Sequence, residues 1–398
     1  MRATSHIKTC NVQENTRGAG AYIKGDREMS RYTEEWGTLL EKLQNGHQEE
    51  IHGVQMEVKD IPDPMEGTVL DPRVYRNRKA EEEKGNPLAA YVEIPVQLIR
   101  DAPGYPNRDI TSIEVIKESV TIQTRNGDTP VYLYRPAGGR EKKAVMVFFH
   151  GGAFIEGSTK TVENFCKILA ELSDMLLVCV DYRLAPEHPF PEGLYDCYDT
   201  VNWVWEHADE IGADKNYLAV GGDSAGGTLA IGCCLLEREA LAAGEVAKNR
   251  ICYEALLYPG VLVNRVKLDD FKWRMADYEI PDDDLLAQGA AVSLKALTAE
   301  MARLYMGGDG PVKDPLAAPL CQESLGGLPK TLTVLCEYDY LRLSAEAFAR
   351  KLERDGVENR TILYRGMDHA FIDKVGDYPQ AYDAAVEIAK DMVELCGN

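Results

Sequence analysis

Apolar runs of strand length alternate with helical patterns along most of the chain after residue 110. Residues 144–149 and 175–180 are continuously apolar, as expected for strands of a sheet that is covered on both faces. Further strands are expected at residues 113–124, 131–134, 217–221, 251–257, 331–335 and 360–364, and helices at 162–172, 194–208, 227–239, 344–354 and 380–395. Strands that alternate with helices predict an α/β fold with a mainly parallel central sheet.

Two regions depart from this alternation. Residues 1–105 contain short amphipathic stretches and no clear strand, which predicts an N-terminal helical arm or cap region. A mobile extension without a role is the alternative, since chain ends are often mobile. Residues 269–307 carry two amphipathic helical patterns without a strand, which predicts a cap-like insertion within a catalytic domain of residues 106–398. Both regions could shape a pocket or could simply pack against the core.

Composition and charge narrow the class of protein. The 398 residues are 45% hydrophobic and 27% charged, which is ordinary for a soluble globular enzyme. No apolar run reaches the roughly 18 residues of a membrane-spanning helix, and the N-terminus lacks a signal-peptide core, so we expect a cytoplasmic protein. The ten cysteines form no C-x-x-C pair and predict buried free thiols. The net charge of −21 argues against nonspecific binding to nucleic acid or anionic membranes.

A candidate nucleophile lies where an apolar strand runs into residues 222–227, which read Gly-Asp-Ser-Ala-Gly-Gly. A serine on such a tight turn between a strand and a helix is held with its hydroxyl exposed above the sheet. Small flanking residues are required because larger side chains would collide with the neighbouring strand. The context on both sides fits, so Ser224 is predicted to be a catalytic nucleophile and not merely a turn residue.

A serine nucleophile needs a neighbouring base that removes its proton, and a histidine base needs a hydrogen-bond acceptor for its other N–H. His369 follows the strand at 360–364 in a glycine-containing loop, which would place its imidazole on the same side of the sheet as Ser224. Asp339 follows the strand at 331–335 and is preferred as the acceptor, with Glu337 as the alternative. The order Ser, Asp, His is that of α/β-hydrolases.

The negative charge that develops on a substrate carbonyl oxygen needs fixed N–H donors. His150-Gly151-Gly152-Ala153-Phe154 follows the apolar strand at 144–149 and could supply them through its glycines. The residue after the nucleophile, Ala225, would complete the oxyanion hole. His150 is expected to order this loop and not to transfer protons.

These motifs together resemble the hormone-sensitive-lipase-like esterases of the α/β-hydrolase superfamily. Six segments in the family's order carry the resemblance, at residues 150–154, 181–191, 222–227, 314–320, 337–342 and 366–371. The resemblance implies an α/β-hydrolase fold with a helical cap, and it covers roughly residues 110–398. Its implied catalytic residues are Ser224, Asp339 and His369, and its implied oxyanion donors are Gly151, Gly152 and Ala225.

Some expectations about individual positions rest only on the resemblance. Residues 181–191 look like the family's structural loop beside the site, so His188 is not expected to be catalytic. Ala153 stands where many members carry a third glycine, and we expect this change to be tolerated because Gly151 and Gly152 supply the donors. The N-terminal region is longer than the family's usual cap segment.

The sequence therefore predicts a serine carboxylesterase that acts on short- to medium-chain acyl esters or acylated small molecules. It is expected to need no metal or organic cofactor. Two alternatives remain at this point: a noncatalytic small-molecule receptor on the same fold, and an acyltransferase or amidase that uses the same three residues. The gibberellin receptors illustrate the first, but they lack the catalytic histidine, whereas His369 is present here. The physiological substrate and any homo-oligomer are left open.

Overall fold

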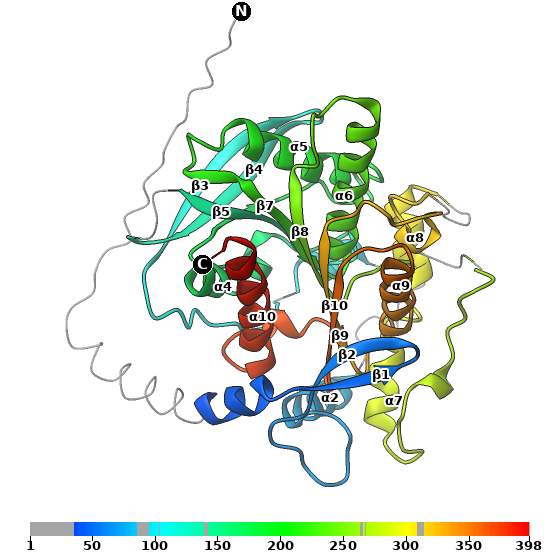
Figure 1. Ribbon diagram of the computed structural model, residues 1–398. Coiled ribbons are helices and arrows are strands. Elements are labelled where there is room, and N and C mark those ends of the chain that lie inside the picture. Colours follow the sequence, from blue (N-terminus) through cyan, green and yellow to red (C-terminus); the bar gives the residue numbers. More distant parts are fainter. Residues whose placement is uncertain are drawn as a thin grey trace, which may run out of the picture.

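One twisted sheet forms the centre of the computed structural model (Figure 1). The structure describes residues 36–85, 95–102, 104–138, 142–262, 266, 268–308 and 314–397. Within these ranges the sheet has ten strands in the order β1-β2-β10-β9-β8-β7-β5-β6-β4-β3. The strands are β1 (His47–Ile51), β2 (Val54–Lys59), β3 (Val115–Thr124), β4 (Gly127–Pro136), β5 (Lys143–Phe149), β6 (Leu176–Val180), β7 (Ala213–Asp223), β8 (Ile251–Leu257), β9 (Lys330–Cys336) and β10 (Asn359–Tyr364).

Neighbouring strands from β2 through β10, β9, β8, β7 and β5 to β6 are parallel. The hairpins β1–β2 and β3–β4 and the pair β4–β6 are antiparallel. All the strands expected after residue 110 are present, and the predicted mainly parallel sheet is confirmed. Because the parallel strands point the same way, the loops that follow β5, β7, β9 and β10 all leave from one edge of the sheet.

Helices cover both faces of the sheet (Figure 1). Alternate residues of β5 show the two faces: Val145 and Val147 pack in the core with α5 and α6, whereas Met146 and Phe148 pack with α4 and α10. Such strands are apolar throughout because neither face meets solvent. The helices are α2 (Pro72–Lys84), α3 (Val96–Arg100), α4 (Thr159–Ser173), α5 (Glu192–Glu206), α6 (Ala225–Ala243), α7 (Leu285–Val292), α8 (Thr298–Met306), α9 (Arg342–Arg354) and α10 (Pro379–Leu395).

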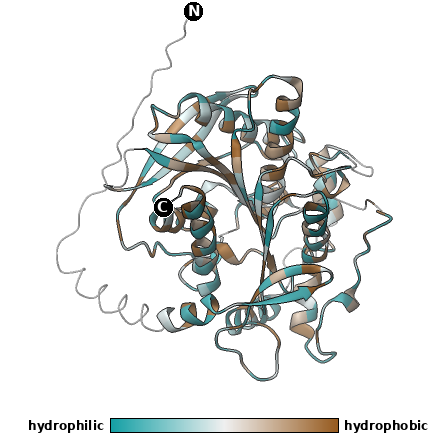
Figure 2. Ribbon diagram, in the orientation of Figure 1, coloured by the Kyte–Doolittle hydropathy of each residue, from teal (hydrophilic) through white to brown (hydrophobic). Residues whose placement is uncertain are grey.

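The N-terminal region differs from its prediction. The expectation that residues 1–105 lack strands is wrong, because β1 and β2 form a hairpin that joins the sheet beside β10. Val54, Met56 and Val58 of β2 are fully buried, while β1 is largely exposed at the edge. Figure 2 shows this outer strand as mostly hydrophilic. Residues 1–35 lie outside the described ranges, so the predicted arm is not described there.

The segment between β8 and β9 contains the two helices that were expected, α7 and α8, and the short 3-10 turn η1 (Met275–Asp277). Among its described residues there is no strand. The described cysteines are free thiols, most of them buried. No helix in the described part of the chain has the length and apolar character needed to cross a membrane.

Candidate active site

Ser224 occupies a strained turn between β7 and α6. Its backbone has φ 52° and ψ −115°, a conformation that non-glycine residues rarely adopt, and its N–H donates to the carbonyl oxygen of Leu257 at 2.9 Å. The turn brings α6 close to β5. A Cβ on Gly226 would lie 2.0 Å from the carbonyl oxygen of Phe149, so glycine is required there. This close approach explains the small residues of the motif.

Ser224, His369 and Asp339 form a continuous chain of hydrogen bonds. The Oγ of Ser224 lies 2.8 Å from Nε2 of His369, and the Nδ1 of His369 lies 2.7 Å from Oδ2 of Asp339. The Asp339 side chain is 1% exposed and that of His369 is 13% exposed. The three predicted residues come from separate loops and are therefore brought together at one edge of the sheet. Only the Ser224 end of this chain of hydrogen bonds is open to a ligand.

Several contacts hold Asp339 in place. The backbone N–H of Leu341 donates to its Oδ1 at 2.9 Å, which leaves Oδ2 for the imidazole. The hydroxyl of Tyr278, which ends η1, donates to its backbone carbonyl at 2.7 Å. The insertion between β8 and β9 thus braces the loop that carries the acid.

Glu337, the alternative acid, and Asp368, the neighbour of His369, have different partners. Glu337 accepts hydrogen bonds from Arg365 at 2.6 Å and from the backbone N–H of Gly366 at 2.8 Å. Asp368 accepts from Nε of Arg78 at 2.7 Å. Glu337 therefore supports the loop that carries His369, and the geometry favours Asp339 over it as the partner of the imidazole.

The loop after β5 corrects one predicted oxyanion donor. The N–H of Gly151 donates to Oδ1 of Asp223 at 2.8 Å, so it is not available to a substrate oxygen. A Cβ at Gly151 would meet Oδ2 of the same carboxylate at 2.4 Å, which explains the glycine as a packing requirement. The prediction of Gly151 as an oxyanion donor is therefore wrong, because this amide positions the loop against the nucleophile turn.

The remaining candidates face a cavity of about 200 Å³ next to Ser224. Gly152, Ala153 and Ala225 all line this cavity. Gly152 has φ 112° and Ala153 has φ 50°, so the loop turns sharply where it meets the cavity. Ala153 is thus a lining residue in its own right and not only a tolerated replacement for glycine.

His150 orders this loop, as expected. Its Nδ1–H donates to the carbonyl of Gly151 at 2.7 Å, and its ring stacks on Tyr182 with 4.3 Å between ring centroids. Burial lowers its pKa, which favours the neutral ring. His188 lies on the exposed surface and pairs with Glu192 at 2.8 Å, away from the chain of hydrogen bonds at Ser224.

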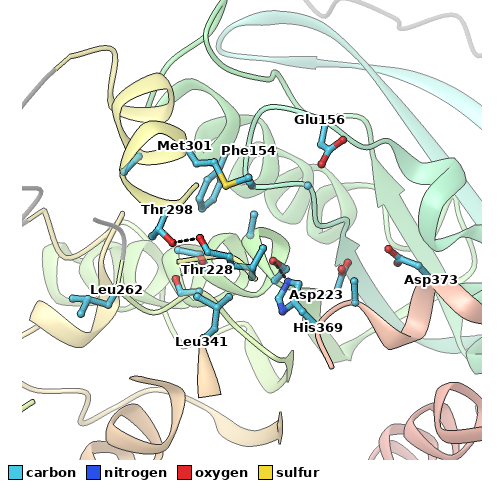
Figure 3. A pocket seen from close by; sticks show the side chains of 18 residues that line it. Phe154, Glu156, Asp223, Thr228, Leu262, Thr298, Met301, Leu341, His369 and Asp373 are labelled. Carbon is cyan, nitrogen blue, oxygen red and sulfur yellow. Dashed lines mark hydrogen bonds between the residues drawn. The ribbon is translucent and has the colours of Figure 1, made fainter. Parts of the chain in front are cut away.

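The cavity has two chemically different sides (Figure 3). Its apolar side consists of Leu262, Leu341 and residues from and beside α8, including Leu294, Met301 and Ala302. The insertion of residues 269–307 therefore contributes to the wall of the site.

Glu156 and Asp373 line the opposite side, and neither was identified from the sequence. Glu156 follows the glycine loop and Asp373 follows His369 by four residues in η3 (Phe371–Lys374), so proximity to those motifs was the only available signal. Burial, followed by the charge of Asp373, raises the pKa of Glu156 to about 7. Burial raises the pKa of Asp373 to about 6, although Lys374 and His369 oppose this shift.

The N-terminal region contacts the loops of the site directly. Arg78 of α2 binds Asp368, the neighbour of His369. Arg100, at the end of α3, donates to the carbonyls of Ile155 at 2.7 Å and Ala185 at 2.8 Å. This region therefore braces both the histidine loop and the glycine loop.

Comparison with known proteins places this geometry in a family. A family model described as the alpha/beta hydrolase fold matches residues 146–373. The chain is 30% identical over 295 residues to the esterase LipI of Mycobacterium tuberculosis, covering 74% of this chain and 85% of that protein. It is 30% identical over 251 residues to an arylesterase of Saccharolobus solfataricus, covering 63% and 75%.

Solved structures give the same result. A hyperthermophilic esterase from the archaeon Pyrobaculum calidifontis superposes with a TM-score of 0.63 at 28% identity, over 82% of this chain and 99% of that one. A fungal esterase of Rhizomucor miehei superposes with a TM-score of 0.63 at 26% identity, over 83% and 98%. The family-model match, the similar proteins and the shared fold agree with the motifs, and the chain therefore belongs to the α/β-hydrolase family, within its hormone-sensitive-lipase-like esterases.

Proposed function

We propose that this protein hydrolyses carboxylic esters through Ser224, His369 and Asp339. The observation that carries the proposal is the unbroken chain of hydrogen bonds from the Ser224 hydroxyl through His369 to buried Asp339, beside a cavity open to a small molecule. The relatives named as esterases support the same reaction.

The geometry accounts for each step. Nε2 of His369 accepts the proton of Ser224 as Oγ attacks the ester carbonyl. Asp339 holds the proton on Nδ1 and stabilises the imidazolium that forms. His369 then gives the proton to the leaving alcohol, which produces an acyl-enzyme on Ser224. A water molecule deprotonated by His369 attacks this acyl group, releasing the acid and restoring the serine.

Gly152, Ala153 and Ala225 are the proposed oxyanion donors. Their backbone amides belong to two segments that meet at Ser224, namely the glycine loop and the first residue of α6. The amide at the N-terminus of α6 also benefits from the helix dipole. Asp223 fixes the distance between these segments by accepting the N–H of Gly151.

The cap role of the insertion and the N-terminal region is part of the proposal. Met301 and Leu294 give the cavity an apolar wall that suits a short or medium acyl chain. Phe154 stacks on Tyr305 of α8 at 3.7 Å between ring centroids, which joins this wall to the oxyanion loop. Substrate size and loop geometry are therefore coupled through α8.

The test is hydrolysis of p-nitrophenyl esters from acetate to dodecanoate by the wild-type protein and by Ser224→Ala. We expect the wild type to turn over one range of chain lengths and the variant to lose activity by about 10⁴-fold or more. Alanine and serine meet the same backbone restriction at this turn, so the variant should unfold at the same temperature as the wild type. Near-normal hydrolysis by a folded Ser224→Ala variant would overturn the proposal. Added acceptor alcohols would reveal any acyl transfer as a new ester product.

A further inference from the structure

The carboxyl groups of Glu156 and Asp373 lie on one side of the cavity, and the apolar residues Leu262, Met301 and Leu341 lie on the other (Figure 3). Neither carboxyl belongs to the chain of hydrogen bonds at Ser224. Ester hydrolysis of a purely apolar substrate would use only the apolar wall. The acidic wall therefore needs an explanation of its own.

Asp373 has an unmet bonding requirement. Its Oδ1 is completely buried and has no hydrogen-bond partner among the described residues. Carboxylate oxygens buried without a partner are costly, and native structures normally provide a donor or a cation for them. Oδ1 itself is closed off from the cavity, but the Asp373 side chain lines it, so a cation in the cavity can act on this carboxylate through its charge, without a hydrogen bond to Oδ1.

The nearest protein cations offset the charge of the pair only in part, since burial outweighs the effect of Arg100 on the pKa of Glu156 and that of Lys374 on the pKa of Asp373. Arg100 forms a two-point ion pair with Glu187 and donates to two backbone carbonyls. Lys374 donates to the carbonyl of Ala370 at 3.2 Å and lies over two tyrosine rings. Neither lines the cavity.

The charges that face the pair do not neutralise it. Asp223 is a third carboxyl nearby, and its interaction with Asp373 raises the pKa of Asp223 after the effect of burial. Of the described residues that line the cavity, His369 alone can carry a positive charge, and it is committed to Asp339 and Ser224. The acidic wall thus presents negative potential to a bound molecule.

We propose that Glu156 and Asp373 select ester substrates that carry a cationic ammonium group, held against the acidic wall while Ser224 attacks the carbonyl. This inference rests on the proposed esterase function and adds a substrate class to it. The apolar wall would receive the uncharged part of the same molecule. A substrate of this class has one apolar end and one positively charged end, separated by the ester.

Matched esters test the charge without changing the shape. For the alcohol side, 2-(trimethylammonio)ethyl butyrate is compared with 3,3-dimethylbutyl butyrate, in which carbon replaces the quaternary nitrogen. For the acyl side, the p-nitrophenyl ester of 4-(trimethylammonio)butanoate is compared with that of 5,5-dimethylhexanoate. The measured quantity is the ratio of kcat/KM for the cationic ester to that for its neutral isostere. Because both esters need the same chemistry, the ratio cancels any general loss of activity.

We expect the wild-type ratio to exceed about tenfold in one of the two pairs, which also reports which end of the ester meets the acidic wall. Glu156→Gln and Asp373→Asn should each lower that ratio, and the double variant should bring it to about one. The control Glu210→Gln removes an exposed carboxylate outside the cavity and should keep the wild-type ratio.

A wild-type ratio of one or below in both pairs would overturn the inference, and this outcome does not depend on any variant folding. A high ratio that persists in a folded double variant would also overturn it, because the long-range field of a protein of charge −21 would then be responsible. Failure of the esterase proposal is distinguishable, since no neutral ester would then be hydrolysed in a manner that depends on Ser224.

Discussion

At the scale of single residues, the site depends on which oxygen of each carboxylate meets which donor. One oxygen of Asp339 accepts a backbone N–H and the other binds the imidazole of His369. Both oxygens of Glu337 instead accept hydrogen bonds from the loop that carries His369. The two acids are two residues apart in sequence and have separate tasks. One orients the base, and the other supports the loop from which the base projects.

Asp339→Asn and Glu337→Gln should therefore behave differently. The amide of Asn cannot hold the proton on Nδ1 of His369, so kcat should fall by about 10⁴-fold while the fold is kept. Glu337→Gln keeps one acceptor and should lower activity far less. Ester hydrolysis and thermal unfolding of both variants provide the comparison. Equal losses in the two variants would contradict these roles.

The acidic wall, formed by Glu156 and Asp373, predicts how the preference for a cationic ester changes with pH. The carboxyls of Glu156 and Asp373, with pKa values raised by burial to about 7 and about 6, gain charge as pH rises through this range. A quaternary ammonium stays charged throughout. The preference for the cationic ester over its neutral isostere should therefore increase from pH 5 to pH 8. Measured ratios of kcat/KM that stay flat over this interval would speak against ionised carboxyls in the recognition.

Motif and position were sufficient to predict that Ser224, His369 and Asp339 lie together, because each follows a buried strand that ends at the same sheet edge. Gly151 was misassigned because a glycine-rich motif does not show which amide is taken by a side chain from elsewhere, here Asp223. Glu156 and Asp373 were missed for a related reason. Their placement depends on how two loops face each other, which no local pattern records.

At the scale of elements, α2 acts as a support for the histidine loop. Arg78 reaches Asp368, whose side chain is largely buried beside His369. Removing this cation would leave a buried carboxylate with weaker compensation, since Lys374 is 3.9 Å away. The position of His369 therefore depends on a helix about 290 residues earlier in the chain.

Arg78→Ala should lower kcat by about tenfold, because small displacements of a catalytic group reduce the rate strongly. The control is Arg76→Ala on the same helix, where the more exposed pair with Asp377 should contribute little. Steady-state kinetics on one p-nitrophenyl ester distinguishes the two. If both variants kept wild-type kcat, α2 would have no positioning role.

Strand β5 and its neighbours were predictable because they are long enough and apolar on both faces. The hairpin β1–β2 was missed because its strands are short and β1 is almost entirely polar, although β2 alternates apolar and polar residues as a half-buried strand does. Only β2 is buried, and the partner that makes it a strand, β10, lies near the other end of the chain. The local sequence therefore could not indicate that this hairpin extends the sheet.

At the scale of the whole molecule, a buried charge network joins the N-terminal hairpin to α10. Lys59 of β2 lies 3.1 Å from Glu387, which also pairs with Arg360 of β10 at 2.8 Å. Burial tends to raise the pKa of Glu387, but Lys390, Arg360 and Lys59 outweigh it and lower the pKa to about 2. The ionised carboxylate is therefore part of what holds the hairpin to the sheet.

This network predicts that the free energy of unfolding depends on pH. A carboxyl with a pKa lowered from 4.5 to about 2 stabilises the fold fully above pH 4.5 and loses that contribution as pH falls toward 2. The wild type should thus exceed Glu387→Gln in free energy of unfolding near pH 6, and the difference should shrink by pH 3. Urea unfolding at several pH values measures it. A difference independent of pH would show that Glu387 acts only through packing.

The pairing of β2 with β10 also constrains how the protein is made. Lys59 of β2 and Glu387 of α10 are 328 residues apart, so the hairpin leaves the ribosome long before β10 and α10 exist. At ordinary rates of translation this interval lasts roughly 15 to 60 s. During that time Val54, Met56 and Val58 lack the residues of β9, α9 and β10 that bury them, so a chaperone could bind the exposed hairpin. A circular permutant that moves the hairpin behind α10 would remove this wait, and should give more folded protein during rapid synthesis.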